Sequence, residues 1–248
     1  MEHCKNCGLP VENEYCSHCG QKIMIPRISF GSVLHEIFHF FTHLEKGFLF
    51  TSRQLLLDPG RTIISYIDGK RKKYQPPVSY FLIWTTIFIL TLYLFEKIFG
   101  ENRVINYNDY FGPGSTTNYA ISHLSIMLTM IIPFQAFYLY LLITKQRYNY
   151  FETLVAGIFA IGTIIQLQFI FAIIALLYAI SGSPLDLRYS DVFKMAYFIW
   201  LTISILKEFS LQYKMIRGVL FIILAAGTFT VWRIFGVPEI ARLFMTQG

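Results

Sequence analysis

Long apolar blocks fill most of the chain after residue 77 and restrict the folds that are open to it. From Val78 onward, five such blocks alternate with short polar connectors. A membrane-spanning helix needs roughly 20 mostly apolar residues, and a helix satisfies its own backbone hydrogen bonds in lipid. We therefore expect an all-α polytopic membrane protein. Its spans are predicted at 78–97, 121–143, 154–180, 192–206 and 216–236.

The composition agrees with this class. The chain is 54% hydrophobic and 15% charged, whereas soluble domains carry about 25% charged residues. The predicted span 192–206 is the weakest, because Lys194 and Lys207 bracket a short apolar core. Both lysines lie near an end, where the ammonium group can reach the headgroups. No Asp, Glu, Arg or His falls near the middle of a predicted span, which argues against a proton-coupled carrier.

The basic residues are distributed unevenly along the chain. Most of the 21 lysines and arginines fall in segment 1–77 and in the connectors 144–153 and 207–217. Cytoplasmic loops carry the excess of Lys and Arg, so the N-terminus is predicted to be cytoplasmic. Five spans then place the C-terminus on the opposite side. The first thirty residues hold no apolar run of signal-peptide length, so we expect no cleaved leader.

Residues 1–24 form a separate module that is defined by its cysteines. In CKNCGLPVENEYCSHCG, two residues separate Cys4 from Cys7, and two separate Cys16 from Cys19, with an eight-residue spacer between the pairs. Four thiolates at this spacing are the ligand set of structural zinc. Because the protein supplies all four ligands, no coordination position stays open for catalysis.

The role of this zinc ribbon is open between two interpretations. A module of this size cannot build a core, so the metal has to fold it. The ribbon then either caps the N-terminus or docks a cytosolic protein partner. His3 and His18 could replace a cysteine, although they suit exposed positions better. Nucleic acid is not an expected partner, because Lys5 and Lys22 are outnumbered by three glutamates and make a poor phosphate surface.

Segment 32–44 predicts an interfacial amphipathic helix. Its apolar residues recur at helical spacing, and it is too short to cross a bilayer. His35, His39 and His43 recur every four residues, and with Glu36 they contain the His-Glu-x-x-His string of zinc metalloproteases. A structural helix, a second metal or pH-sensing site at the histidines, and a metalloprotease all remain open. The protease would need a third ligand, for which His43, Glu45 and Asp58 are the local candidates.

A basic block stands directly before the first predicted span. Pro-Gly at 59–60 predicts a turn, and a short helix is expected at 61–67. The basic block is either a topology determinant that touches anionic headgroups, worth about 1 kcal/mol per basic residue, or a specific site for an acidic lipid headgroup or partner. We call this block the collar. It consists of Lys70, Arg71, Lys72 and Lys73.

Two stretches carry a recognisable pattern, CKNCG…YCSHCGQK and EKGFLFTSRQLLLDPGRTIISYIDGKRKKYQPPVSYFLI. The pattern resembles a bacterial family of membrane proteins, the domain of unknown function 3667. The family has no assigned reaction, so the resemblance implies an architecture and a bacterial inner membrane, and it leaves the His-Glu-x-x-His string outside the family's motif. The positions that match are Cys4, Cys7, Cys16, Cys19, Gly20, Gln21, Gly47, Thr51, Pro59, Gly60, Tyr66, Gly69, Lys70, Arg71, Tyr74 and Pro77.

We therefore divide the chain into a cytoplasmic zinc ribbon (1–24), interfacial helices with the collar (25–77) and a transmembrane bundle (78–248). The expected function is a non-enzymatic inner-membrane scaffold or accessory subunit with a periplasmic C-terminus. Its ribbon would dock a protein partner, and its collar would bind membrane headgroups or an acidic partner. One alternative is a small transporter or lipid-handling protein, with a polar cavity around Gln166 and Gln168. The other is the metalloprotease at His35, Glu36 and His39.

Overall fold

The computed structural model describes residues 2–29, 31–32, 47–100, 104–106, 124–179, 185–186, 189–236 and 238–240. These residues are predominantly helical, which confirms the predicted all-α class. The elements before the first long helix are β1 (Glu2–His3), β2 (Pro10–Val11), α2 (Phe48–Leu57) and α3 (Pro59–Ile67). The rest are α4 (Pro77–Phe99), β3 (Ile105–Asn106), α7 (Leu124–Thr129), α8 (Ile132–Leu139), η1 (Tyr140–Thr144), α9 (Tyr150–Ala179), β4 (Leu185–Asp186), α10 (Tyr189–Lys207), α11 (Lys214–Val231) and η2 (Trp232–Gly236).

Four of the described helical segments are long and apolar enough to cross a membrane. They overlap four of the five predicted spans and confirm the polytopic class. The second segment runs from α7 through α8 into the π-helical turn η1, and the fourth continues from α11 through η2. The four segments are Pro77–Phe99, Met127–Thr144, Tyr150–Ala179 and Lys214–Ile240.

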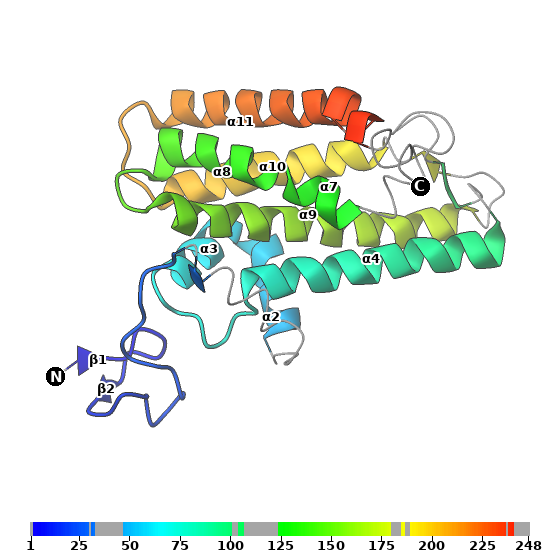
Figure 1. Cartoon of the computed structure of the whole chain (residues 1–248). Coiled ribbons are helices and arrows are strands. Elements are labelled where there is room, and N and C mark those ends of the chain that lie inside the picture. The colour runs from blue at the N-terminus through cyan, green and yellow to red at the C-terminus, as the bar shows by residue number, and fades with distance from the viewer. Residues whose placement is uncertain are drawn as a thin grey trace.

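The predicted span 192–206 forms α10, which is not one of these four segments. Asp191 and Lys194 lie in its first two turns and form an ion pair, and Arg233 Nη1 approaches Asp191 Oδ2 to 3.3 Å. These charges shorten the apolar length that remains for lipid. Figure 1 shows α10 lying among the candidate spans, where it returns the chain from the end of α9 to the start of α11.

Helix α9 occupies the centre of the bundle and packs against α4, α8, α10, α2 and α3. It is apolar on every face, as a helix surrounded by other helices must be. Phe159 and Ile165 are almost wholly buried. Gly162 lets α4 approach closely, because a Cβ at this position would lie 2.8 Å from the ring of Tyr80. The core therefore depends on a small residue in the middle of α9.

Helix α11 forms an outer edge of the bundle (Figure 1). Only 17% of its most apolar stretch is buried against other helices. Met215, Ile216, Val219 and Ile223 are among its exposed apolar side chains. Lipid tails are as apolar as these side chains, so a bilayer can cover this face at no hydrophobic cost. The exposed face is thus consistent with the membrane class.

Helices α2 and α3 close one end of the bundle, where α4, α9 and α11 begin and α10 ends (Figure 1). We call this the collar end. The predicted turn at 59–60 is wrong, because Pro59 and Gly60 are the first two residues of α3. Gly60 packs directly on α10: its N–H donates to Ser204 Oγ at 2.9 Å, and a Cβ would lie 2.2 Å from the Ser204 carbonyl carbon. Long-range packing therefore decides the local structure here.

Candidate functional site

The ribbon is built from two similar tight turns, each of which carries one cysteine pair. In each turn the glycine after the second cysteine donates its N–H to the carbonyl of the first, Gly8 to Cys4 and Gly20 to Cys16, both at 2.8 Å. The two glycines have φ angles of 78° and 69°, in the left-handed region that glycine adopts without strain. The turns bring both cysteines of a pair to the same point, and β1 pairs antiparallel with β2 beside the first turn.

The four sulfur atoms lie close together. The Sγ atoms of Cys4 and Cys19 are 3.6 Å apart, as are those of Cys7 and Cys16, and all four lie within 4.8 Å of one another. Four sulfurs bound tetrahedrally at about 2.3 Å from a metal are roughly 3.8 Å apart. The cluster could therefore hold a metal ion. No other group of three or more candidate ligands occurs among the described residues, and both ribbon histidines are exposed outside the cluster.

Gln21 attaches the ribbon to the loop before α4. Its side chain is buried. Its Nε2 donates to the Gly69 carbonyl at 2.8 Å, and its Oε1 accepts from the Lys72 N–H at 3.2 Å. We call these two hydrogen bonds the Gln21 bridge. Because the amide uses both its donor and its acceptor on backbone groups, it fixes the ribbon against the collar in one orientation.

The segment after the ribbon is tied to the start of α9. Asn149 and Glu152 form a capping box: Glu152 N–H donates to Asn149 Oδ1 at 2.8 Å, and Asn149 N–H donates to Glu152 Oε2 at 2.9 Å. Arg27 adds a forked pair of hydrogen bonds to the same carboxylate, at 2.9 and 2.7 Å. The Glu152 side chain is almost wholly buried, so the guanidinium supplies the charge that this carboxylate needs.

Asp68, at the end of α3, joins the same end of the bundle to the connector before α9. Its carboxylate pairs with Arg147 and accepts a hydrogen bond from the Tyr148 hydroxyl at 2.7 Å. Burial raises the pKa of Tyr148, and the contact with Asp68 raises it further. Tyr148 therefore remains a neutral donor at ordinary pH. These contacts make the collar end a connected layer of polar side chains above the apolar bundle.

The four collar residues separate into two pairs. Arg71 lies over the Tyr66 ring at 5.6 Å and donates Nη2 to the Pro26 carbonyl at 3.4 Å. Lys72 takes part in the Gln21 bridge through its backbone and carries its side chain toward the ribbon. Lys70 and Lys73 instead line a pocket on α2 and α3. The collar is therefore not a uniform charged surface.

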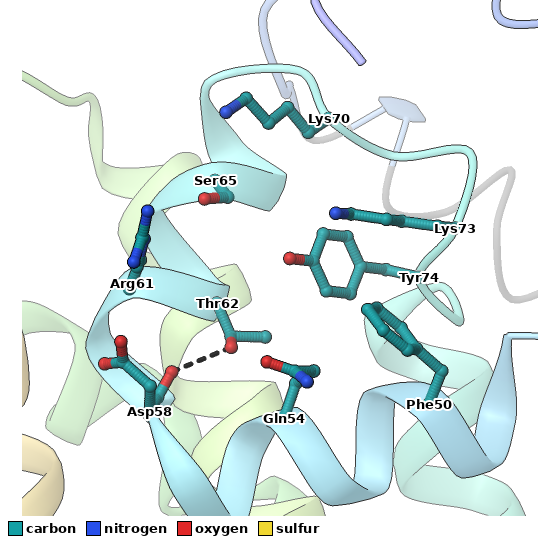
Figure 2. Close-up of a pocket in the computed structure, with 9 residues that line it drawn as sticks. All are labelled: Phe50, Gln54, Asp58, Arg61, Thr62, Ser65, Lys70, Lys73 and Tyr74. Carbon is teal, nitrogen blue, oxygen red and sulfur yellow. Dashed lines mark hydrogen bonds between the residues drawn. The ribbon is translucent and has the colours of Figure 1, made fainter. Parts of the chain in front are cut away.

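This pocket has a volume of about 220 Å³. Nine residues from α2, α3 and the following loop line it, and Figure 2 labels all of them. Arg61, Lys70 and Lys73 bring three cationic groups to its rim, while the hydroxyls of Ser65 and Tyr74 point into the same space (Figure 2). Tyr74 is buried and the three cationic side chains are exposed. The pocket thus combines a polar inner wall with a positively charged entrance.

The pocket contains one acidic residue, Asp58, and it is already engaged. Its Oδ1 accepts a hydrogen bond from Ser204 Oγ at 3.0 Å, and its carbonyl accepts one from Thr62 Oγ1 at 2.7 Å. Burial raises the pKa of Tyr74, although Arg61 and a hydrogen bond with Ser65 act in the opposite direction. Tyr74 is therefore a neutral phenol that can donate a hydrogen bond. The arrangement is suited to an anion with several oxygen atoms.

The structure does not test some of the predicted positions, and it shows another in a different role. His35, Glu36, His39 and His43 lie outside the described residues, so the three interpretations of segment 32–44 stay predictions. In the bundle, Gln166 Oε1 accepts a hydrogen bond from the Tyr80 hydroxyl at 2.8 Å. Gln166, predicted for the transporter alternative as part of a polar cavity, thus bonds to α4.

Sequence reasoning did not identify Arg61, Ser65 and Tyr74 as members of a site. A signal for the first two was present, because Asp58, Arg61, Thr62 and Ser65 follow one another at helical spacing and share one face of α3. Tyr74 joins them only through the path of the loop after α3. The family pattern included Tyr74 and Gln21 but gave no role to either.

One comparison with known proteins covers the part of the chain that lines the pocket. Residues 45–89 match the family model described as protein of unknown function (DUF3667), which confirms the resemblance over that segment. The match contains every residue that lines the pocket. No curated protein and no solved structure matches the chain.

Proposed function

We propose that the protein is a non-enzymatic scaffold or accessory subunit of a bacterial inner membrane. Its ribbon binds one structural zinc ion through Cys4, Cys7, Cys16 and Cys19 and docks a protein partner on the cytoplasmic side. Its collar contacts anionic headgroups at the membrane surface. Five crossings, with α10 as the fourth, place the C-terminus in the periplasm.

The observation that carries this proposal is the attachment of a closed four-thiol cluster to the membrane domain. Four thiolates are the ligand set that structural zinc prefers, and they leave no open position for substrate or water. The Gln21 bridge fixes the cluster against the collar. A metal module held in this way presents a constant surface, which suits recognition more than chemistry.

Two further observations support the location and the partner. The described residues before α4 and the connectors 144–153 and 207–217 carry most of the basic residues and lie at the collar end (Figure 1). Cytoplasmic loops carry this excess. On the ribbon itself, Leu9, Tyr15 and Met24 are exposed at 42, 55 and 78%. Large exposed apolar side chains on so small a module offer contact area to a protein partner.

A photo-crosslinking amino acid at Tyr15, in the full-length protein in its native membrane, tests the docking role. We expect a discrete adduct with a second protein, and we expect Cys4→Ser combined with Cys16→Ser to abolish it. The same probe at Leu177, which is exposed on α9, is the control and should give no such adduct. A metal-loaded protein whose Tyr15 probe captures nothing would overturn the docking role.

A further inference from the structure

The three cations of the pocket outnumber its one carboxylate, Asp58. Arg61, Lys70 and Lys73 form no ion pair within the described residues. Two other cations of this end are paired, Arg27 with Glu152 and Arg147 with Asp68. Three like charges around one small space repel one another unless an anion joins them. With Asp58 as the one carboxylate in its lining, the pocket keeps a net positive charge.

Lys73 is held over the entrance by aromatic rings. Its Nζ lies 5.5 Å from the ring centre of Phe50 and 5.5 Å from that of Tyr74. Such contacts orient an ammonium group without neutralising it. The amine therefore keeps its charge and its three donors for a ligand. Tyr74 and Ser65 line the same pocket (Figure 2), and their hydroxyls can donate to two oxygens of one anion.

The position of the pocket suits the headgroup layer of a membrane. Tyr74 precedes the first candidate span, which begins at Pro77, by three residues. Helix α2 runs across the direction of the spans at this end (Figure 1), and exposes Leu49 and Leu57 at 76 and 58%. Exposed apolar side chains on a helix at this depth insert between lipids. The volume of about 220 Å³ suits a small group, since drug-sized ligands occupy about 300–1,000 Å³.

We propose that this pocket binds the phosphate group of an anionic phospholipid, with Arg61, Lys70 and Lys73 neutralising it and Tyr74 and Ser65 donating hydrogen bonds. The inference deepens the proposed function and rests on its placement of the collar at the membrane surface. The proposed function has the whole collar contact anionic headgroups, whereas this inference assigns the binding to one pocket. Arg61, which lies outside the collar in the sequence, belongs to that site, whereas Arg71 and Lys72 do not.

The test uses the full-length protein in nanodiscs of phosphatidylcholine with a minor fraction of phosphatidylglycerol. Native mass spectrometry then counts the phosphatidylglycerol that remains bound to the released protein. We expect Arg61→Gln combined with Lys73→Gln to weaken retention about tenfold or more, because two charged donors to the phosphate group are lost. The charge-preserving pair Arg61→Lys with Lys73→Arg should keep most of the preference.

A matched control separates a site from general surface charge. Arg53→Gln combined with Lys72→Gln removes the same charge from two exposed side chains outside the pocket. We expect this variant to retain phosphatidylglycerol as the wild type does. Equal losses in both double variants, or no loss in either, would overturn the proposal. Unchanged metal content and melting temperature in each variant exclude misfolding as the cause.

A second arm distinguishes the source of the phosphate. Inorganic phosphate is titrated against the protein in nanodiscs of phosphatidylcholine alone, and the melting temperature is recorded. A rise that needs Arg61 and Lys73, without any preference for phosphatidylglycerol, would overturn the lipid assignment in favour of a soluble phosphate. The Tyr15 crosslink, repeated with Arg61→Gln and Lys73→Gln, keeps the two proposals apart. The crosslink should persist in this variant. A wild-type protein that gives the crosslink but shows no preference for phosphatidylglycerol would reject the pocket and retain the docking role.

Discussion

The ribbon and the helical bundle differ in what holds them together. The ribbon contains one short strand pair, β1 with β2, and its turns bring four cysteine thiols together. Its buried apolar residues are two of these cysteines, Cys4 and Cys16. In the bundle, a continuous set of buried side chains from α3, α4, α9 and α10 forms the core, with glycines at the close contacts. A few polar contacts, the Gln21 bridge above all, join the two regions.

Because different interactions stabilise the two regions, we expect each to unfold separately from the other. A ribbon without a core is stable only while its ligands hold a metal. A bundle that buries apolar helices needs no metal. The joint between them is polar and small, so it can open while both regions stay folded. Three predictions test this separation, from the largest expected effect to the smallest.

Removal of the metal should produce the largest effect, and it should be confined to the ribbon. Cys4→Ser combined with Cys16→Ser takes away two of four ligands. Structural zinc contributes about 10–16 kcal/mol of apparent binding free energy in small metal-folded modules, so we expect the ribbon to unfold and the metal content to drop from about one ion per chain to none. Elemental analysis measures the metal, and circular dichroism should show an unchanged helical signal.

The histidines of segment 32–44 provide the control for this measurement. His35→Ala combined with His39→Ala should leave the metal content unchanged if the cysteines are the sole ligands. A second ion that disappears with these histidines would restore the metal interpretations of the segment. Metal that survives loss of Cys4 and Cys16 would contradict the ribbon site.

The next effect concerns the bundle alone. Gly60→Ala places a Cβ 2.2 Å from the Ser204 carbonyl carbon, so α3 and α10 must move apart. Overpacking of this kind typically costs about 1–3 kcal/mol, occasionally more. We expect a lower melting temperature in detergent with full metal content. The experiment is a thermal unfolding curve combined with elemental analysis.

Gly227→Ala is the matched control for this substitution. Nothing lies within 4 Å of the Cβ that it would add. Alanine favours a helix over glycine by about 1 kcal/mol, so we expect an equal or slightly higher melting temperature. Equal destabilisation by the two substitutions would show that the contact of Gly60 with α10 is not what supports the bundle.

The smallest of the three effects concerns the joint. Gln21→Ala removes both hydrogen bonds of the Gln21 bridge. The Lys72 N–H loses its acceptor, whereas the Gly69 carbonyl keeps the Arg71 N–H at 3.0 Å. Such a loss costs about 1–3 kcal/mol, which raises the open population of the joint by about fivefold or more. We expect limited proteolysis within residues 22–29 to become faster by a similar factor, while metal content and melting temperature stay constant.

The exposed pair Glu14–Lys22 supplies a control on the same ribbon. Both side chains are more than half exposed, and pairs of this kind contribute little to stability. Glu14→Ala should therefore leave the proteolysis rate near that of the wild type. If it accelerates cleavage as much as Gln21→Ala does, the ribbon as a whole has loosened, and the joint is not a distinct element.

Features that depend on neighbouring residues could be predicted from the sequence. The cysteine cluster could be predicted from the spacing of the two Cys-x-x-Cys pairs, because one tight turn brings the two cysteines of each pair together. The apolar blocks determine their helices in the same way. The predicted span 192–206 forms a helix for this reason, even though Asp191 and Lys194 keep it below the apolarity of the other spans.

Features that join distant segments could not be predicted. Gly60 follows a proline, which locally indicates a turn, and only the approach of Ser204 shows why the helix begins there. The collar residues are consecutive, but their side chains diverge because Gly69, with φ at 107°, turns the loop toward Gln21. The pocket needs Arg61 and Tyr74 on two sides of that loop. No periodicity in the sequence predicts that these two residues line the same pocket.

The contact between Arg27 and Glu152 has a consequence for the order of assembly. Synthesis proceeds from the N-terminus, and domains fold as they emerge, so the ribbon can take up its metal while the helices are still being made. Glu152 stands 125 residues after Arg27, at the start of α9. The pair cannot close until the ribosome has passed two candidate spans and begun a third. The ion pair can therefore form only in a chain in which synthesis has reached α9. In a shorter nascent chain Arg27 has no Glu152 to pair with.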